Sequence, residues 1–317
     1  MQIEKLKLLF GKNLRLRNLI RTNLKDFSPA KVEFEISNGK KNFLFSFFLM
    51  IFLFTSVSFS QWKYELFPSG LNIQPFTANY LEPKAGLLIG LDKNQLQLDI
   101  STSKDIVHWS NDNDVISFGA DLFPFTRLRS TNDFKFPVET IDYLFGFNAG
   151  YKTKTCNNNE YGFRFRLSHI SAHLVDGQFD AQTQQWRDGR KPFVFSKEFI
   201  EIFPFYRVNT FRAYAGFTYI FHVIPDVIKN GIFQIGFDYF ATQVGTDYLT
   251  PFVAYDFKLN GVEKYTGNNI ISAGVKFGNW NQRGLSLYFT YMSGKSIHGE
   301  YFDVNENYSS VGFNFEL

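Results

Sequence analysis

Most of this chain alternates apolar and polar residues with a period of two. At the C-terminus, Val311, Phe313 and Phe315 share one face, while Gly312 and Asn314 share the other. Successive side chains of a β-strand point to opposite faces, so this period predicts strands with one apolar face. Twelve segments carry such a pattern, and only 193–207 mixes its faces: 85–91, 96–100, 116–122, 141–151, 163–168, 193–207, 211–221, 233–239, 249–257, 271–277, 285–291 and 309–317.

Two all-β architectures give this alternation. A soluble β-sandwich packs the apolar face on a second sheet, whereas a transmembrane barrel turns it toward lipid. The segments are long, the chain holds 40 Phe, 16 Tyr and 4 Trp, and the polar face is rich in glycine. These features favour a transmembrane antiparallel β-barrel of about twelve strands, with the soluble periplasmic sandwich as the alternative.

The expected connections fit a barrel because shorter turns alternate with longer loops. The shorter turns are expected at 102–112, 153–159, 208–210, 244–248 and 279–283. The longer loops are expected at 127–138, 174–192, 223–229, 259–267 and 295–307.

The first 60 residues predict export. Lys40 and Lys41 precede the apolar run 43–54, and Ser58 and Ser60 stand at the −3 and −1 positions of a cut before Gln61. This is the three-part pattern of a cleaved signal peptide, and an apolar run of twelve residues, interrupted by Ser46, is too short to span a bilayer. Four parts follow: a basic extension or misassigned start at 1–42, the signal core and cleavage region at 43–60, a periplasmic segment at 61–84, and the barrel at 85–317.

Charge and cysteine content exclude several classes of function. Residues 1–60 hold ten of the 33 basic residues but only four of the 30 acidic ones, so the exported part is slightly acidic. This balance gives no reason to expect nucleic-acid binding. The chain has a single cysteine, Cys156, which excludes a disulfide framework and a multi-cysteine metal site. Scattered histidines predict no metal site, and no cofactor is expected.

Three short stretches resemble a family of bacterial outer-membrane barrels without an assigned function. They are 65–70 with 78–84, 166–174, and 291–294 with 298–302. The resemblance implies a Gram-negative outer-membrane location and a barrel fold. It also implies membrane lipids and, during biogenesis, the barrel-assembly machinery as partners of a monomer.

One group of residues could carry chemistry. His169, Ser171 and His173 alternate, so they share a strand face, and they continue the apolar series of Phe163 and Phe165. That face is the outer wall, and the triplet lies just before the longest loop. The structural interpretation is a set of interfacial side chains packed near that loop.

The His-x-Ser pair also resembles outer-membrane phospholipase A and the lipid A deacylases. In that resemblance His169 is the general base and Ser171 the acyl nucleophile, acting on outer-leaflet phospholipid or lipid A. An acid or amide on a neighbouring strand would orient His169. By parity Glu201 shares the outer face on the next strand but lies too deep, and Glu198 has the opposite parity.

Charged residues on the polar faces predict a network inside the barrel, because a buried charge must be paired. Its expected members are Arg164, Arg166, Arg212, Asp142, Asp238 and Asp256. A twelve-stranded lumen is narrow. The sequence therefore favours a structural barrel or narrow solute channel without enzymatic activity, with the surface acyl hydrolase as the alternative.

Overall fold

The computed structural model describes residues 62–155, 157, 159–246 and 248–316. The predicted extension and signal peptide, 1–60, lie outside these residues. No helix in the described part of the chain is long and apolar enough to cross a membrane.

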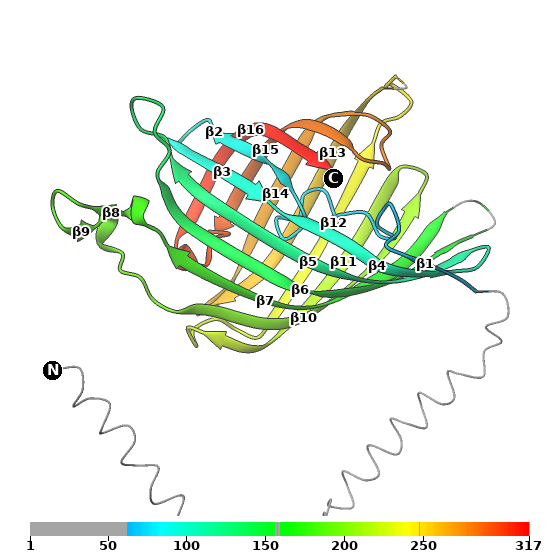
Figure 1. The fold of residues 1–317 in the computed structure, drawn as a ribbon, viewed down its shortest axis with the longest axis horizontal. Coiled ribbons are helices and arrows are strands. Elements are labelled where there is room, and N and C mark those ends of the chain that lie inside the picture. The colour runs from blue at the N-terminus through cyan, green and yellow to red at the C-terminus, as the bar shows by residue number, and fades with distance from the viewer. Residues whose placement is uncertain (1–61, 156, 158, 247, 317) are drawn as a thin grey trace, which may run out of the picture. The chain divides into compact units, whose positions relative to one another are not determined.

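The described chain forms a closed antiparallel barrel of 12 strands, as predicted, and the closed sheet excludes the sandwich (Figure 1). Antiparallel neighbours follow chain order, and β16 closes the barrel on β2. The wall consists of β2 (Ala85–Gly90), β3 (Gln95–Ile100) with β4 (Thr102–Ser110), β5 (Asp114–Arg129), β6 (Val138–Lys154), β7 (Glu160–Leu174), β10 (Phe195–Val208), β11 (Phe211–Ile224), β12 (Gly231–Phe240), β13 (Leu249–Val262), β14 (Lys264–Phe277), β15 (Gly284–Lys295) and β16 (Asn305–Glu316).

The seam near β2 is the irregular part of the wall. β3 and β4 act as one strand interrupted at Ser101, since both pair with β5. β2 pairs only with the β3 half, while the far end of β4 pairs with the short strand β1 (Lys63–Leu66). Residues 102–105 of β4 therefore have a strand partner on one side only within the described chain.

Two expected connections are strands instead. Residues 102–110, expected as a turn, form β4, and the turn to β5 is only 111–113. Glu263 alone separates β13 from β14, where a loop at 259–267 was expected; its φ of 55° provides the reversal. These strand ends extend past the apolar band, and polar residues such as Asn260 and Lys264 interrupt the alternation from which strands were predicted.

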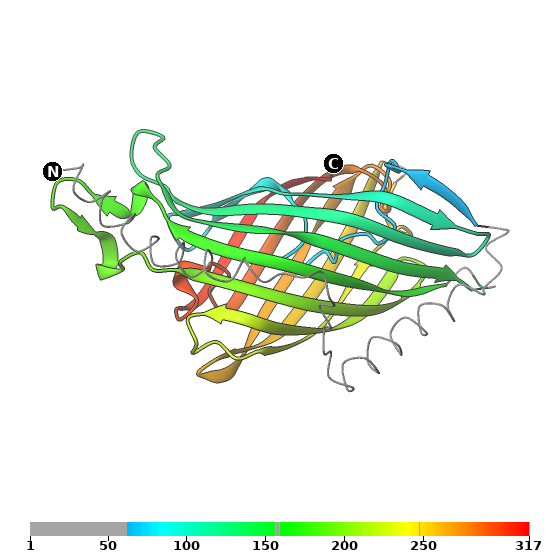
Figure 2. The same cartoon turned by 60° about the horizontal axis from the view of Figure 1, so that its bottom comes forward.

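The barrel has two distinct ends. One, the loop end, carries the connections 91–94, 130–137, 175–194, 225–230 and 296–304; the other is the turn end. The loop 175–194 contains a small hairpin, β8 (Phe179–Asp180) and β9 (Gln185–Trp186), and two 3-10 turns, η2 (Asp176–Gln178) and η3 (Arg187–Gly189). This hairpin projects beyond the wall (Figure 2).

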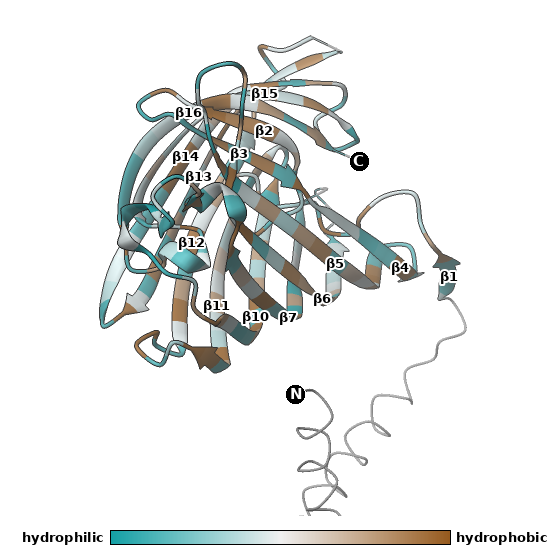
Figure 3. Ribbon diagram, turned by 60° about the vertical axis from the view of Figure 1, so that its left-hand side comes forward, coloured by the Kyte–Doolittle hydropathy of each residue, from teal (hydrophilic) through white to brown (hydrophobic). Residues whose placement is uncertain are grey.

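Apolar and polar residues alternate along the strands (Figure 3). The outer face is apolar and exposed, with Phe145, Phe147, Phe217 and Phe233 each at least 40% exposed. The inner face carries most of the buried polar and charged residues, including Asp121, Arg166 and Asp238. This is the distribution of a wall with lipid on one side and a polar interior on the other.

Residues 71–84, here named the plug, run inside the barrel (Figure 1). Phe76 is fully buried against Phe203 and Tyr214, with ring centroids 5.3 and 4.2 Å away. Residues 61–84 were expected as a periplasmic segment separate from the barrel, but residues 71–84 lie within it. The plug has no period-two pattern, so only its contacts with inward-facing residues reveal its place.

The plug also explains the mixed faces of β10. Its odd-numbered residues point inward, where Phe199, Phe203 and Phe205 are buried in apolar clusters together with plug residues. Its even-numbered residues, such as Ile202 and Tyr206, are exposed on the outer face. Both faces of this strand are apolar because one meets the plug and the other faces outward.

Candidate functional site

Three neighbouring strands place polar side chains together on the outer wall, near the loop end. We name this group the outer-wall cluster: His169, Ser171 and His173 of β7, Ser196 and Glu198 of β10, and His222 of β11. The β7–β10 register sets Glu198 opposite His169 and Ser196 opposite Ser171. Residues directly opposite each other have neighbouring side chains on one face of the sheet.

Glu198 is the carboxylate that holds His169. The His169 Nδ1 atom lies 2.5 Å from Glu198 Oε1, and both side chains are little more than one-quarter exposed. A carboxylate at Nδ1 fixes the imidazole orientation and favours the tautomer whose Nε2 is an acceptor. His169 also packs on the Phe145 ring, with centroids 4.9 Å apart. The ring is thus held from two sides.

The predicted parity of the two glutamates is wrong. Glu198 lies on the outer face and Glu201 points inward, where Arg166 Nη1 donates to its Oε1 at 2.8 Å. The 20-residue connection between β7 and β10 does not carry strand parity across, so alternation in β7 could not fix the faces of β10. The sequence did contain an indication that Glu198 faces outward, because the apolar residues Ile200, Ile202 and Tyr206 share its parity.

Ser171 lies between two polar neighbours. Its partners across the sheet are Tyr143 of β6 and Ser196 of β10. The Ser171 hydroxyl makes no side-chain hydrogen bond with any described residue, while Ser196 Oγ donates to Glu198 Oε1 at 3.0 Å. Ser171 and His169 are two residues apart on one strand, a backbone spacing of roughly 6–7 Å that their side chains can bridge. Ser171 is thus the hydroxyl that remains available.

The two remaining histidines border the site. His173 is exposed, and its ring lies 6.2 Å from that of Tyr143. His222 Nδ1 contacts Glu198 Oε2. Uninterrupted alternation along β11 would turn His222 inward together with Arg212 and Tyr214, but the register with β10 shifts beyond Glu198, so that Phe199 pairs with Ile220 and Glu198 with His222. Such a bulge resets the alternation and turns His222 outward.

The predicted lumen charges all lie inside the barrel, but in separate groups. Arg164 and Arg166 bind the plug: Arg164 Nη1 donates to Glu82 Oε2 at 2.7 Å, and Arg166 Nη1 donates to the Leu81 carbonyl at 3.0 Å. Arg166 also binds Asp121 and Glu201. Glu82 could not be expected as their partner, because the plug was predicted to lie outside the barrel.

The other lumen charges hold different segments. Arg212 binds Asp238 and donates to the carbonyls of Gln74 and Pro75. Asp256 accepts from Tyr214 Oη at 2.6 Å. These contacts attach further parts of the plug and the wall to one another.

Asp142 closes the loop end. Its carboxylate contacts His298 Nδ1 at 2.8 Å and accepts from the Gly299 amide at 2.7 Å. Those residues belong to the connection 296–304, which includes the 3-10 turn η4 (Gly299–Tyr301). The connection folds inward, since His298, Glu300 and Tyr301 are buried. It therefore narrows the lumen beyond the plug.

Within the described residues, no group of three or more His, Cys, Asp or Glu is arranged to hold a metal ion. The outer-wall cluster offers a hydroxyl, an imidazole and a carboxylate on one face. Side chains of this kind can perform nucleophilic acyl transfer without a cofactor.

The chain belongs to a family described as protein of unknown function (DUF1207), whose model matches residues 141–317. No curated protein matches it. Among solved structures it is similar to the outer membrane phospholipase A from Escherichia coli, with 12% identity, a TM-score of 0.49, and coverage of 78% of this chain and 95% of that one.

Two further solved structures are similar with lower TM-scores. The beta domain of the Bordetella autotransporter BrkA has 10% identity, a TM-score of 0.39, and coverage of 74% and 97%. Acinetobacter baumannii OccAB1 has 11% identity, a TM-score of 0.34, and coverage of 70% and 73%.

Proposed function

We propose that this protein is a monomeric outer-membrane barrel, inserted by the barrel-assembly machinery, whose outer wall hydrolyses acyl esters of membrane lipids. The observation that carries this proposal is the 2.5 Å contact between His169 Nδ1 and Glu198, which leaves Nε2 for a strand neighbour with a free hydroxyl. In this assignment Ser171 is the nucleophile, His169 the general base and Glu198 the residue that orients it.

The reaction would proceed in two steps. Ser171 Oγ attacks the ester carbonyl while His169 Nε2 takes its proton, and the carbonyl oxygen becomes an oxyanion. The intermediate collapses to an acyl-serine as His169 returns the proton to the departing alcohol. Water, deprotonated by His169, then attacks the acyl-serine and releases a fatty acid. Glu198 stabilises the imidazolium in both steps.

The position of the cluster supports a lipid substrate. His169 and Ser171 share the outer face with Phe163, Phe165 and Leu167, all exposed apolar residues. A lipid could reach Ser171 laterally with its acyl chains along these side chains. His173, further toward the loop end, would meet the headgroup region.

The packed interior favours this function over the narrow channel expected from the sequence. Plug residues Phe76, Asn79 and Glu82 are each at most 2% exposed inside the barrel. A diffusion pathway would require the ion pairs of Glu82 with Arg164 to break, and separating a buried pair is costly. The outer wall, in contrast, needs no rearrangement to admit a lipid.

Acyl release tests the assignment. The purified chain in mixed micelles with phospholipid or lipid A should release fatty acid, and Ser171→Ala should lower the rate by about 10³-fold or more. Ser168→Ala is the matched control, because Ser168 lies on the same strand but faces the lumen without a hydrogen-bond partner for its hydroxyl within the described residues. Equal rates of fatty-acid release for the wild type and Ser171→Ala would contradict the hydrolase assignment. Loss of fatty-acid release in Ser196→Ala but not in Ser171→Ala would identify Ser196 as the nucleophile.

Membrane location needs its own measurement. Cell fractionation should place the chain with outer-membrane markers, and the folded barrel should migrate faster than the heated chain in a detergent gel. Release in the soluble periplasmic fraction would contradict the outer-membrane assignment without reference to catalysis.

A further inference from the structure

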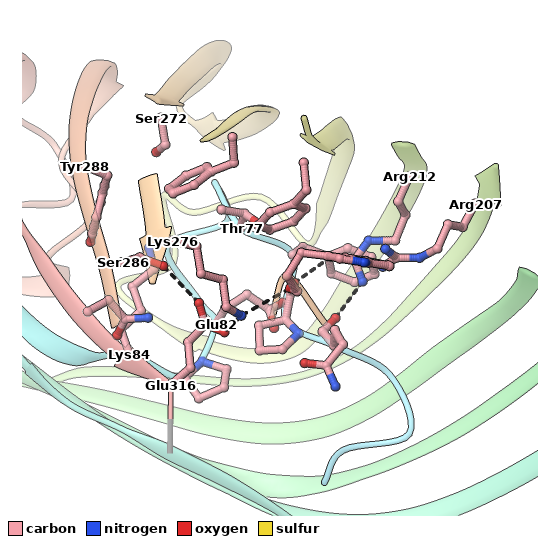
Figure 4. Close-up of a pocket in the computed structure, with 18 residues that line it drawn as sticks. Thr77, Glu82, Lys84, Arg207, Arg212, Ser272, Lys276, Ser286, Tyr288 and Glu316 are labelled. Atoms are coloured by element: carbon pink, nitrogen blue, oxygen red, sulfur yellow. Dashed lines mark hydrogen bonds and ion pairs between the residues drawn. The ribbon is translucent and has the colours of Figure 1, made fainter. Parts of the chain in front are cut away.

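A cavity of about 70 Å³ lies inside the barrel, between the plug and the turn-end halves of β10 to β16. We name it the lumenal cavity (Figure 4). Its charged lining comes from opposite sides: Arg207 and Arg212 enter from one side, Lys84 and Glu316 from the other. Phe76, Phe240 and Phe252 supply much of the apolar wall. The volume is sufficient for a few water molecules or a small solute.

The lining is more cationic than anionic, and part of that charge is already paired. Lys276 binds Glu316, and Arg212 binds Asp238. Glu82, which also lines the cavity, binds Arg164 from outside the lining. Both acidic groups of the lining, Glu82 and Glu316, therefore already have cationic partners. Neither of them pairs with the other two cations of the lining, Arg207 and Lys84.

Arg207 is buried, and its guanidinium is only partly satisfied. Only 6% of the residue is exposed, and its Nε and Nη1 atoms have no hydrogen-bond partner among the described residues. The nearest carboxylate oxygen, of Glu160, is 3.5 Å from Nε. Arg207 lies between two charged cross-strand neighbours, Glu160 on β7 and a second cation, Arg212, on β11. A buried guanidinium beside a like charge, with a single carboxylate at the edge of contact, is stabilised when a further anion joins it.

Lys84 adds a second cation across the cavity. Within the described chain, its ammonium group has no ion pair with a carboxylate and no hydrogen bond. Trp280 completes the Arg207 side, with the guanidinium carbon 4.9 Å from its ring centroid. The cavity thus offers the Lys84 ammonium group and two unsatisfied donor nitrogens of Arg207, separated by aromatic surface.

An adjoining space gives a route to this cavity. A second cavity of about 410 Å³ shares Gln74, Pro75, Pro83 and Glu316 with the first. It is also lined by Thr102 and Ser103 of β4, on the stretch that lacks a strand partner on one side. A solute could therefore enter at the turn end, along the seam between β4 and β16.

We propose that the lumenal cavity binds a small oxyanion, a carboxylate or phosphate group carried by a solute, with Arg207 as its principal hydrogen-bond donor and Lys84 as a second cationic contact. A guanidinium presents a planar set of donors that matches two oxygens of such a group. The aromatic lining favours an oxyanion attached to an apolar group over a bare ion. This site is separate from the outer-wall cluster and does not depend on its activity.

Calorimetric titration of the full chain in neutral detergent tests the proposal, with inorganic phosphate and benzoate as probes at ionic strength matched with sodium chloride. We expect saturable binding of at least one probe, with benzoate the tighter. Stronger phosphate binding would assign the site to phosphoryl groups. Saturable binding of neither probe would overturn the proposal.

Variants connect the binding to the cavity. Arg207→Gln should weaken the preferred probe by about tenfold or more, and Lys84→Gln by a smaller factor. Lys264→Gln, an exposed cation at the loop end, is the matched control and should bind as the wild type does. Should Arg207→Gln fail to fold, Lys84→Gln still tests the proposal. Lys84 forms no ion pair with a described carboxylate, so we expect this variant to fold. Unchanged affinity in Lys84→Gln and in every folded Arg207 variant would contradict the proposal.

Discussion

The two faces of β7 use polar residues in different ways. Inward, Arg166 has ion pairs with Asp121, Glu201 and Glu82, and its residue is 1% exposed. Outward, His169 has one carboxylate and is 27% exposed at the side chain. Arg166 is fully paired and holds the plug, whereas the outer-wall cluster keeps an imidazole nitrogen and a hydroxyl available. Saturation indicates a structural role, and an unsaturated, oriented set indicates chemistry.

Removal of Arg166 should have the largest effect. Arg166→Met leaves three buried carboxylates without one of their cations, so we expect the free energy of unfolding to fall by about 3–5 kcal/mol. Denaturant unfolding of the purified barrel measures it, with exposed Lys264→Met as the control. An unchanged midpoint would mean that the inward charges do not hold the plug.

Phe76→Ala tests the apolar attachment of the plug. Phe76 is fully buried, so its truncation should cost about 3 kcal/mol of unfolding free energy through lost burial and a cavity. Acyl release by the folded fraction should stay within about twofold of the wild type, since only the lumen is changed. A parallel loss of activity would contradict the separation of the two faces.

Glu198→Gln tests the outer face. The amide can still accept from His169 Nδ1 but carries no charge for the imidazolium, so acyl release should fall by about 10- to 100-fold. Unfolding free energy should change by less than about 1 kcal/mol, because the carboxylate is partly exposed. His222→Ala is the comparison: it removes the other imidazole on Glu198 and should reduce the rate less. The reverse order would assign the base to His222.

Much of this comparison could be predicted from the sequence. Alternation identified the twelve strands, and the inward Arg164, Arg166 and Arg212 and the outward His169 and Ser171 follow from it. The face on which Glu198 lies could not be assigned, because the connection 175–194 separates the alternation of β10 from that of β7. The plug could not be placed either, since non-periodic residues such as Phe76 and Glu82 reveal their location only through contacts distant in sequence.

The smallest expected effect concerns the loop-end closure. Burial raises the pKa of Glu300, in η4, to about 7. A carboxyl whose pKa is higher in the folded state stabilises the fold below its unfolded pKa, and this contribution is lost as the pH rises through about 7. We expect this group to make the unfolding free energy lower at pH 8 than at pH 5. Glu300→Gln should reduce that difference; an identical pH profile would contradict the assignment.

Labelling with a fluorophosphonate probe tests the central claim most directly, because it reports an activated serine without knowledge of the substrate. The probe should modify Ser171, as located by mass spectrometry of the detergent-folded barrel. His169→Ala should abolish the reaction, and the heat-unfolded chain should not react. Absence of modification, or modification of Ser171 that persists in His169→Ala, would contradict the outer-wall cluster as a hydrolase site.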